Sequence, residues 1–203
     1  MHIPDGFLDT KTIVITNVIS LGFLAAAFRK VNKQFSPERI PLMGVLAAFA
    51  FVAQLLAFPV IGGTSAHITG AVLLAVIVGP YTSLVLIATI LLMQSLIFQH
   101  GGILTIGANL LNLGVIGSLG GYLIYAVRKN FFTAGMAAFI TVLVGGIFAG
   151  FELAWSGRMD LRTALIGMST AQLIAGAMEA FVTVSILGVI QKVRPDLLEL
   201  DTV

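Results

Sequence analysis

The sequence lacks cysteine altogether and has few charged residues for its length. Without cysteine the chain cannot form disulfide bonds, thiolate metal sites or a cysteine nucleophile. Charged residues make up 10% of its 203 residues, whereas a soluble domain has about 25%. A soluble protein of this size needs a polar surface that so few charges cannot provide. The composition therefore excludes a soluble enzyme and a nucleic-acid-binding protein, and it indicates an integral membrane protein.

Long apolar runs take up most of the chain, in which 58% of the residues are hydrophobic and the mean hydropathy is +1.05. Because a helix needs about 20 apolar residues to cross a membrane, the runs predict an all-α polytopic membrane protein, a bundle of about seven transmembrane helices. The segment 71–78 is apolar on every face, which excludes the alternating pattern of a membrane β-barrel. The predicted helices lie at 12–28, 41–58, 66–79, 81–98, 103–127, 131–155 and 163–191.

Only Gly79-Pro80 separates the third run from the fourth. Together the two runs are too long for one ordinary span, so we expect two helices joined by a tight turn. A single re-entrant segment is the alternative. No long polar linker interrupts the chain, and residues 1–203 are therefore expected to form one integral membrane domain.

Basic residues are distributed unevenly between the two ends of the predicted bundle. Since basic loops stay in the cytoplasm, the distribution predicts a multi-pass protein of a prokaryotic cell membrane with its N-terminus outside and its C-terminus in the cytoplasm. Residues 1–11 then form an extracytoplasmic segment, 12–191 the helix bundle and 192–203 a cytoplasmic tail. The acidic flank before the first run is the opposite of a cleaved signal peptide. The cytoplasmic side receives Arg29, Lys30, Lys33, Arg39, Arg128, Lys129, Lys192 and Arg194, and the outer side Lys11, Arg158 and Arg162.

The histidines of the chain are His2, His67 and His100. The predicted topology places His2 in the outer N-terminal segment, His67 at the end of the outer loop 61–67 and His100 in the outer loop 98–102. All three therefore fall on the same side of the membrane. A loop histidine is most often a solvated side chain, which is the simplest interpretation of His100.

His2 differs because the second position of a chain has a coordination chemistry of its own. The α-amine of Met1, the backbone nitrogen of His2 and its imidazole Nδ1 can bind one cation together, in a five-membered and a six-membered chelate ring. Three nearly coplanar nitrogens leave one equatorial position, which His67 or His100 could fill. Square-planar nitrogen ligation selects Ni(II) or Cu(II), and imidazole also suits Co and Zn. Hard cations such as Mg(II) prefer oxygen ligands.

The residues after His2 favour a chain that folds back toward the bundle. Pro4 fixes its own φ angle and has no N–H group, and Asp5-Gly6 favours a turn. The alternative is a frayed and solvated terminus, the commonest state of a chain end.

Two segments carry a resemblance to a known family. The opening octet closely resembles the start of the CbiM/NikM family, the substrate-binding (S) components of energy-coupling-factor (ECF) transporters for nickel and cobalt. A segment that ends three residues after His67 looks like the second motif of that family. The resemblance extends over the whole chain. The two segments read Met1-His2-Ile3-Pro4-Asp5-Gly6-Phe7-Leu8 and Gly62-Gly63-Thr64-Ser65-Ala66-His67-Ile68-Thr69-Gly70.

The resemblance implies a membrane subunit that imports Ni(II) or Co(II) and is not an enzyme. The N-terminal segment is expected to insert into the bundle from outside. The amine of Met1, the amide nitrogen and imidazole of His2, and the imidazole of His67 should then form a four-nitrogen square-planar site. The resemblance thus chooses His67 over His100 as the fourth ligand and gives His100 no role, so it is a second-shell residue, an alternative ligand or only a loop residue.

The partners implied by the resemblance are a transmembrane coupling (T) subunit and two cytoplasmic ATPase subunits, often with one further small membrane protein. This sequence agrees, because it contains no G-x-x-x-x-G-K-[ST] phosphate loop and hence no ATP site of that type. Some relatives carry the small protein as a C-terminal extension. Since this chain ends at Asp201-Thr202-Val203 without further spans, we expect any such component to be separate.

Glu152 and Glu179 lie in apolar surroundings, where ionisable groups usually face the protein interior. The simplest interpretation makes both buried hydrogen-bond partners, with Glu152 as an alternative metal ligand near the outer end of its helix. Two alternative functions also remain. A self-sufficient divalent-metal channel or ion-coupled carrier would work without ATPase partners, and an intramembrane metalloenzyme is disfavoured because no H-E-x-x-H motif occurs.

Overall fold

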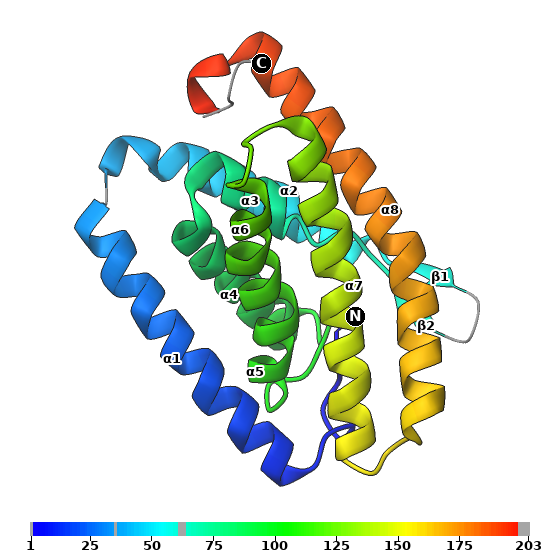
Figure 1. Ribbon diagram of the computed structural model, residues 1–203. Helices are drawn as coiled ribbons and strands as arrows, with labels where there is room; N and C mark the ends of the chain where they lie inside the picture. The colour runs from blue at the N-terminus through cyan, green and yellow to red at the C-terminus, as the bar shows by residue number, and fades with distance from the viewer. Residues whose placement is uncertain (1, 35, 61–63, 199–203) are drawn as a thin grey trace.

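The computed structural model describes residues 2–34, 36–60 and 64–198, and helices account for most of this part of the chain (Figure 1). Short segments separate consecutive helices, and one of these segments contains a pair of three-residue strands. The helices are α1 (Thr10–Gln34), α2 (Ile40–Leu55), α3 (Ala71–Val78), α4 (Pro80–Ile97), α5 (Ile106–Asn109), α6 (Gly121–Tyr125), α7 (Phe131–Trp155) and α8 (Leu161–Val193), and the strands are β1 (Phe58–Val60) and β2 (Thr64–Ala66).

A π-helical stretch, η2 (Leu110–Gly120), joins α5 to α6, so Ile106–Tyr125 is one continuous helix. Polar side chains at helix starts explain several boundaries. Asp160 accepts hydrogen bonds from the N–H groups of Arg162 and Thr163 at the start of α8, and Asn130 forms a capping box at the start of α7.

Six helical segments in the described residues are long and apolar enough to cross a membrane. The prediction of a polytopic all-α bundle is confirmed. Gly79, with a φ angle of 85°, separates α3 from α4, so the predicted turn between two helices is also confirmed. The third predicted helix is much shorter than its apolar run, because β2 pairs with β1 in an antiparallel hairpin and residues 67–70 form a loop. The six spans are Thr10–Lys33, Pro37–Leu55, Pro80–Ile97, Ile106–Tyr125, Phe131–Trp155 and Leu161–Val193.

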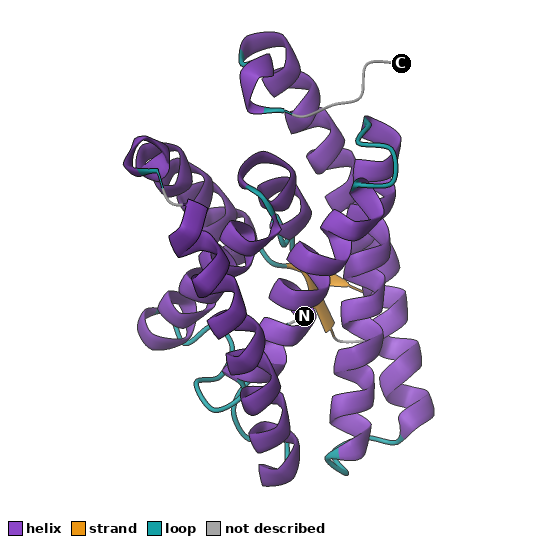
Figure 2. Ribbon diagram, turned by 60° about the vertical axis from the view of Figure 1, so that its left-hand side comes forward, coloured by secondary structure: helices purple, strands orange, loops and turns teal. Residues whose placement is uncertain are grey.

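The helices are arranged so that α7 and α8 lie side by side and α1 runs along the opposite flank of the bundle (Figure 1). The two strands, orange in Figure 2, lie beside α8 and project past it in Figure 1. In Figure 1, α1 begins at the lower end of the molecule and α8 ends at the upper end. The placement of the two termini on opposite sides of a membrane stays a prediction. The assignment of the lower end to the outside rests on the basic residues and stays a prediction, as does the division into segments 1–11, 12–191 and 192–203.

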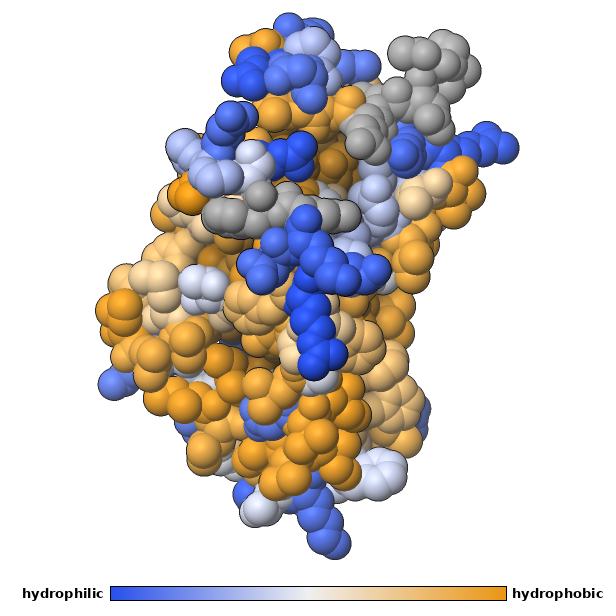
Figure 3. All heavy atoms as spheres, turned by 90° about the vertical axis from the view of Figure 1, so that its left-hand side faces the viewer, coloured by the Kyte–Doolittle hydropathy of each residue, from blue (hydrophilic) through white to orange (hydrophobic). Residues whose placement is uncertain are grey.

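The outer surface fits a membrane protein. On the flank that carries α1, apolar side chains cover the middle of the molecule, and most hydrophilic side chains gather in its upper part (Figure 3). Large apolar side chains such as Val18, Leu21 and Phe28 of α1 are exposed. An apolar surface of this extent needs lipid or protein around it.

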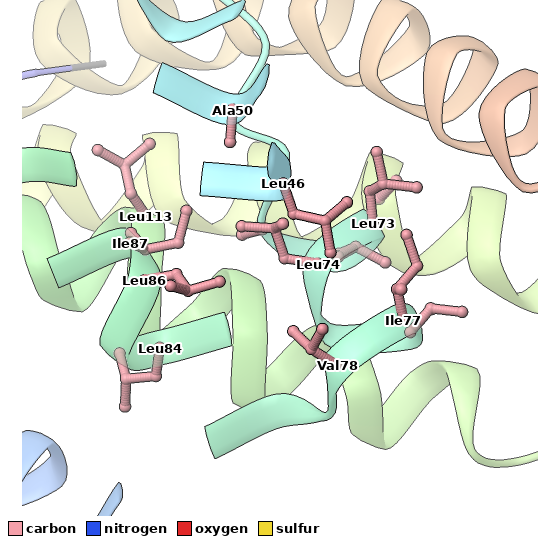
Figure 4. Close-up of a cluster of buried hydrophobic side chains, with 14 of the residues drawn as sticks. Leu46, Ala50, Leu73, Leu74, Ile77, Val78, Leu84, Leu86, Ile87 and Leu113 are labelled. Atoms are coloured by element: carbon pink, nitrogen blue, oxygen red, sulfur yellow. The ribbon is translucent and has the colours of Figure 1, made fainter. Parts of the chain in front are cut away.

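The interior is built around α3, in which every residue from Ala71 to Val78 is buried. Its side chains pack with Leu46 of α2, Ile87 of α4 and Leu113 of η2 (Figure 4). Close approach of η2 requires glycine, because a Cβ atom at Gly117 would lie only 2.7 Å from the Cβ of Ala71. Protein covers α3 on every side, which explains why its side chains are apolar on every face.

The far end of α3 borders a cavity of about 810 Å³. Its walls include Val76 to Gly79 of the α3 end and charged residues from other segments, Glu38, Arg39, Arg194 and Asp196. The start of α3 lies four residues after His67. The helix thus connects the His67 region with a polar cavity at its other end.

Candidate metal centre

The N-terminal segment, residues 2–9, is folded into the bundle. Ile3 is 3% exposed, and its backbone is held on both sides by side chains and backbone from residues 102–109. Asn109 accepts a hydrogen bond from the N–H of Ile3 at 2.7 Å and donates one to its carbonyl at 3.0 Å. The hydroxyl of Thr105 and the N–H of Gly102 donate to the same carbonyl. Hydrogen bonds therefore hold the chain from His2 onward in the bundle, and the alternative of a frayed terminus does not apply to it.

Asp5 fastens the same segment a second time. Its carboxylate accepts hydrogen bonds from the backbone N–H groups of Ile103, Leu104 and Thr105, at 3.0, 2.9 and 3.2 Å. These three amides precede the helix that begins at Ile106, where a carboxylate is favoured. The expected turn at Asp5-Gly6 is present, and it directs the carboxylate into this loop.

The three histidines meet at one place, although they come from three distant segments. The ring of His2 lies 4.6 Å from that of His67 and 4.4 Å from that of His100, measured between ring centroids. The rings of His67 and His100 are 6.2 Å apart. His2 is thus the central ring, with His67 brought in by the loop after β2 and His100 by the loop after α4.

One pair of ring nitrogens has the geometry of two ligands of the same metal. The Nδ1 of His2 lies 3.0 Å from the Nε2 of His67. Metal–nitrogen bonds of about 2.0–2.1 Å place neighbouring corners of a square about 2.9 Å apart. The Nδ1 of His67 lies 3.2 Å from the carbonyl of Ile68, and a bond there leaves the lone pair on Nε2, the nitrogen that faces His2.

Burial keeps both imidazoles ready to act as ligands. His67 is only 3% exposed. Burial lowers the pKa of His2 well below its usual value, and the neighbouring imidazole of His67 acts in the same direction. Burial likewise lowers the pKa of His67 well below its usual value. Both rings are therefore neutral near pH 7, the form in which histidine binds metals.

Side chains alone do not complete a metal site here. Within the described part of the chain, no group of three histidine or carboxylate side chains is close enough to hold a metal ion. His100 contributes a ring against His2, and its Nε2 is buried without a hydrogen-bond partner among the described residues. The predicted donor Met1 lies outside the described residues.

Both glutamates that lie in apolar runs are hydrogen-bonded, as the sequence suggests, but with different kinds of partner. Glu152 of α7 accepts a hydrogen bond from the amide of Asn112 at 2.7 Å. Glu179 of α8 instead contacts Thr69 and Gly70, close to His67. Glu179 lies 110 residues after Thr69 and 109 residues after Gly70, so nothing in the sequence indicated this pairing.

Asn109 and Thr105 hold the N-terminal segment, but the sequence did not indicate this role for either residue. A polar residue inside an apolar run was the available signal for Asn109, because such residues need a partner. Nothing in the sequence indicated that the partner is the backbone of Ile3.

Comparison with known families identifies the chain. Residues 2–197 match the CbiM family, described as the cobalt uptake substrate-specific transmembrane region. The chain belongs to the CbiM family. The match includes His2, His67 and His100 and all six candidate spans, and it confirms the family that the two sequence motifs indicate.

Relatives of this CbiM chain are metal transport proteins. A putative fused nickel transport protein NikMN of Archaeoglobus fulgidus is 33% identical over 98% of this chain and 68% of the relative. A cobalt transport protein CbiM of Acetoanaerobium sticklandii is 37% identical over 71% of this chain and 64% of the relative. The crystal structure of a transition metal transporter matches with a TM-score of 0.89 at 31% identity and covers 95% of this chain and 93% of that one. The expectation of a multi-pass transport protein rather than an enzyme is confirmed.

Proposed function

We propose that this CbiM chain is the metal-capturing S component of an ECF-type importer for Ni(II) or Co(II). The ligands are the α-amine of Met1, the amide nitrogen and Nδ1 of His2, and the Nε2 of His67. The observation that carries the proposal is the 3.0 Å approach of His2 Nδ1 to Nε2 of the buried His67. These are the two side-chain atoms that a four-nitrogen square would use.

The surroundings of the site support a ligand set that includes backbone and terminal nitrogens. Asn109 fixes the N–H and carbonyl of Ile3, the residue after His2. The backbone next to His2 is thereby held in one conformation, so little freedom remains to be lost when the metal binds. A site that used side chains alone would not need the chain end to be positioned in this way.

The ligand chemistry favours nickel and cobalt over the abundant hard cations. Nitrogen donors suit Co, Ni, Cu and Zn, whereas Mg(II) and Ca(II) prefer oxygen. Relatives named for nickel and for cobalt both occur, which fits one ligand set that serves both ions. Deprotonation of the amine and amide accompanies binding, so the affinity should fall as the pH falls.

The proposed partners are a transmembrane coupling subunit, two cytoplasmic ATPase subunits and a further small membrane subunit. The chain has no phosphate loop of the Walker type, so the energy for release must come from elsewhere. The exposed apolar flanks of the helices are surfaces on which a membrane partner could pack. Uptake by the isolated chain in liposomes without ATPase subunits would instead support a channel or carrier.

Calorimetry on the detergent-solubilised chain, with any tag at the C-terminus, tests the proposal directly. We expect Ni(II) and Co(II) each to bind at one site per chain, at least a thousandfold more tightly than Mg(II). Equal affinity for Ni(II) and Mg(II), or more than one equivalent site, would contradict the four-nitrogen site.

Replacing Asp5 should weaken binding without removing a ligand. Asp5→Ala deletes the acceptor of three backbone N–H groups and releases the N-terminal segment from the loop that ends at Thr105. We expect the Kd for Ni(II) to rise about tenfold, with a smaller rise for Asp5→Asn, whose side chain keeps one oxygen. Asp160→Ala is the matched control, because it removes a carboxylate that caps α8 and leaves the N-terminal segment intact. An Asp5→Ala protein with unchanged Kd would show that this anchor does not support the site.

A further inference from the structure

Glu179 makes an unusually complete set of hydrogen bonds with the loop that follows His67. It lies near the middle of α8 and is fully buried. Its Oε2 accepts from the N–H of Thr69 at 2.6 Å, and its Oε1 accepts from the N–H of Gly70 at 2.7 Å. The hydroxyl of Thr69 donates to Oε1 at 2.9 Å. One carboxyl group thus binds two successive amides and a side chain.

The same loop is held from its other side by α2. The amide Nε2 of Gln54 donates to the carbonyl of Thr69 at 2.8 Å. Gly70 adopts a φ angle of +72°, and a Cβ there would lie 3.2 Å from the Cβ of Ala50. Only glycine fits that conformation and that approach easily. Thr69 is therefore fixed between α8 and α2, which restricts Ile68, the one residue that links it to His67.

The position of His67 follows from this arrangement. Its imidazole is two residues from Thr69, and its Nδ1 lies against the carbonyl of Ile68, the residue between them. The ring of His67 meets His2 only if the loop backbone holds its present course. The strand before His67 also meets α8, because β2 packs against that helix and Ala66 shares a buried cluster with Ala175.

We propose that Glu179 is a positioning residue for the metal site, which holds His67 Nε2 in place and makes α8 the helix that controls this ligand. The proposal rests on the four-nitrogen site proposed above. Glu179 does not bind the metal. It acts through Thr69 and Gly70, so a displacement of α8 at this level displaces His67 relative to His2.

The chemistry of the contact explains why a carboxyl group is suited to it. Two oxygens can accept from several donors at once. Alanine or leucine at this position would leave two buried N–H groups without acceptors, which is costly inside a membrane protein. Glutamine keeps an oxygen for one of the two amides but turns its NH₂ group toward the N–H of the other, so it restores the contact in part.

The test measures Ni(II) affinity and the rate of Ni(II) loss to excess EDTA for the full chain in detergent. Glu179→Ala should raise the Kd about tenfold or more, mainly through faster dissociation, and Glu179→Gln should have an intermediate effect. Thr69→Val removes only the hydroxyl donor and should give a smaller change in the same direction. Thr183→Val is the matched control, because it changes a buried polar residue one turn further along α8 and should leave both values unchanged.

A double-mutant cycle separates positioning from general damage. In a His67→Ala background the amine of Met1 and the nitrogens of His2 still provide residual binding. If Glu179 acts only through His67, adding Glu179→Ala to that background should change the residual Kd less than twofold. An equal loss in both backgrounds would overturn the proposal, and so would a wild-type Kd and EDTA rate in Glu179→Ala.

Failure of the proposed site gives a different result. If the wild-type chain does not bind Ni(II), or if His67→Ala binds it normally, then the four-nitrogen site is wrong whatever Glu179 does. If His67→Ala loses affinity while Glu179→Ala and Thr69→Val do not, only the positioning role is wrong. If Glu179→Ala does not fold, Thr69→Val and Glu179→Gln replace it in the test. A wild-type Kd and a wild-type EDTA rate in both of these variants would refute the positioning role.

Discussion

Extending the chain by Gly-Ser-Gly before Met1 is expected to weaken Ni(II) binding by at least two orders of magnitude. The proposed chelate needs a free amine on the residue next to His2. Three added residues turn that amine into an amide and place the new amine far from the five-membered ring. A single added residue is a poorer test, because an amine two residues before a histidine would complete a four-nitrogen chelate of its own.

The control for this extension uses the same sample. A cleavable extension whose removal leaves Met1 as the first residue should give back the full affinity, measured by calorimetry before and after cleavage. Unchanged tight binding in the extended protein would show that the Met1 amine is not a ligand. The search would then turn to His67, His100 and Glu152 as a site made of side chains.

The second large effect is expected for His67→Ala, which should lose at least a hundredfold in Ni(II) affinity. Its Nε2 is the ring nitrogen that lies 3.0 Å from His2 Nδ1. His100→Ala should change the Kd by less than about threefold, because its ring packs edge-on against His2 and no ring nitrogen of His100 is paired with His2 Nδ1. Calorimetry on both variants, with thermal melts to confirm folding, compares the two candidates directly. A larger loss for His100→Ala would exchange their roles.

The sequence predicts the membrane bundle well because a long apolar run is stable in lipid only as a membrane-spanning helix. The turn at Gly79-Pro80 was predictable for a local reason, since proline starts a helix and glycine ends one. The length of α3 was not predictable. The predicted helix began at Ala66, but Ala66 belongs to the strand that pairs with β1 and residues 67–70 form a loop, and a three-residue strand has too little pattern to recognise.

The sequence predicted which residues could bind a metal, but not the contacts that hold those residues in place. His2 was a candidate because of its place next to the chain end, and His67 because of the motif around it. The contacts that hold them join residues about a hundred positions apart, Ile3 with Asn109 and Thr69 with Glu179. Such pairs depend on how the helices pack, which a single sequence does not specify.

The burial of α3 has an electrical consequence. This helix is about 12 Å long at 1.5 Å per residue, and every residue in it is covered by protein. A cation that left the histidines along it would lose its water with nothing polar to replace it, at an idealised cost of order 20 kcal/mol for a singly charged ion and more for a divalent one. In this conformation α3 therefore insulates the polar cavity from the histidines, and the membrane can keep its voltage. Passage of the metal requires this insulator to move.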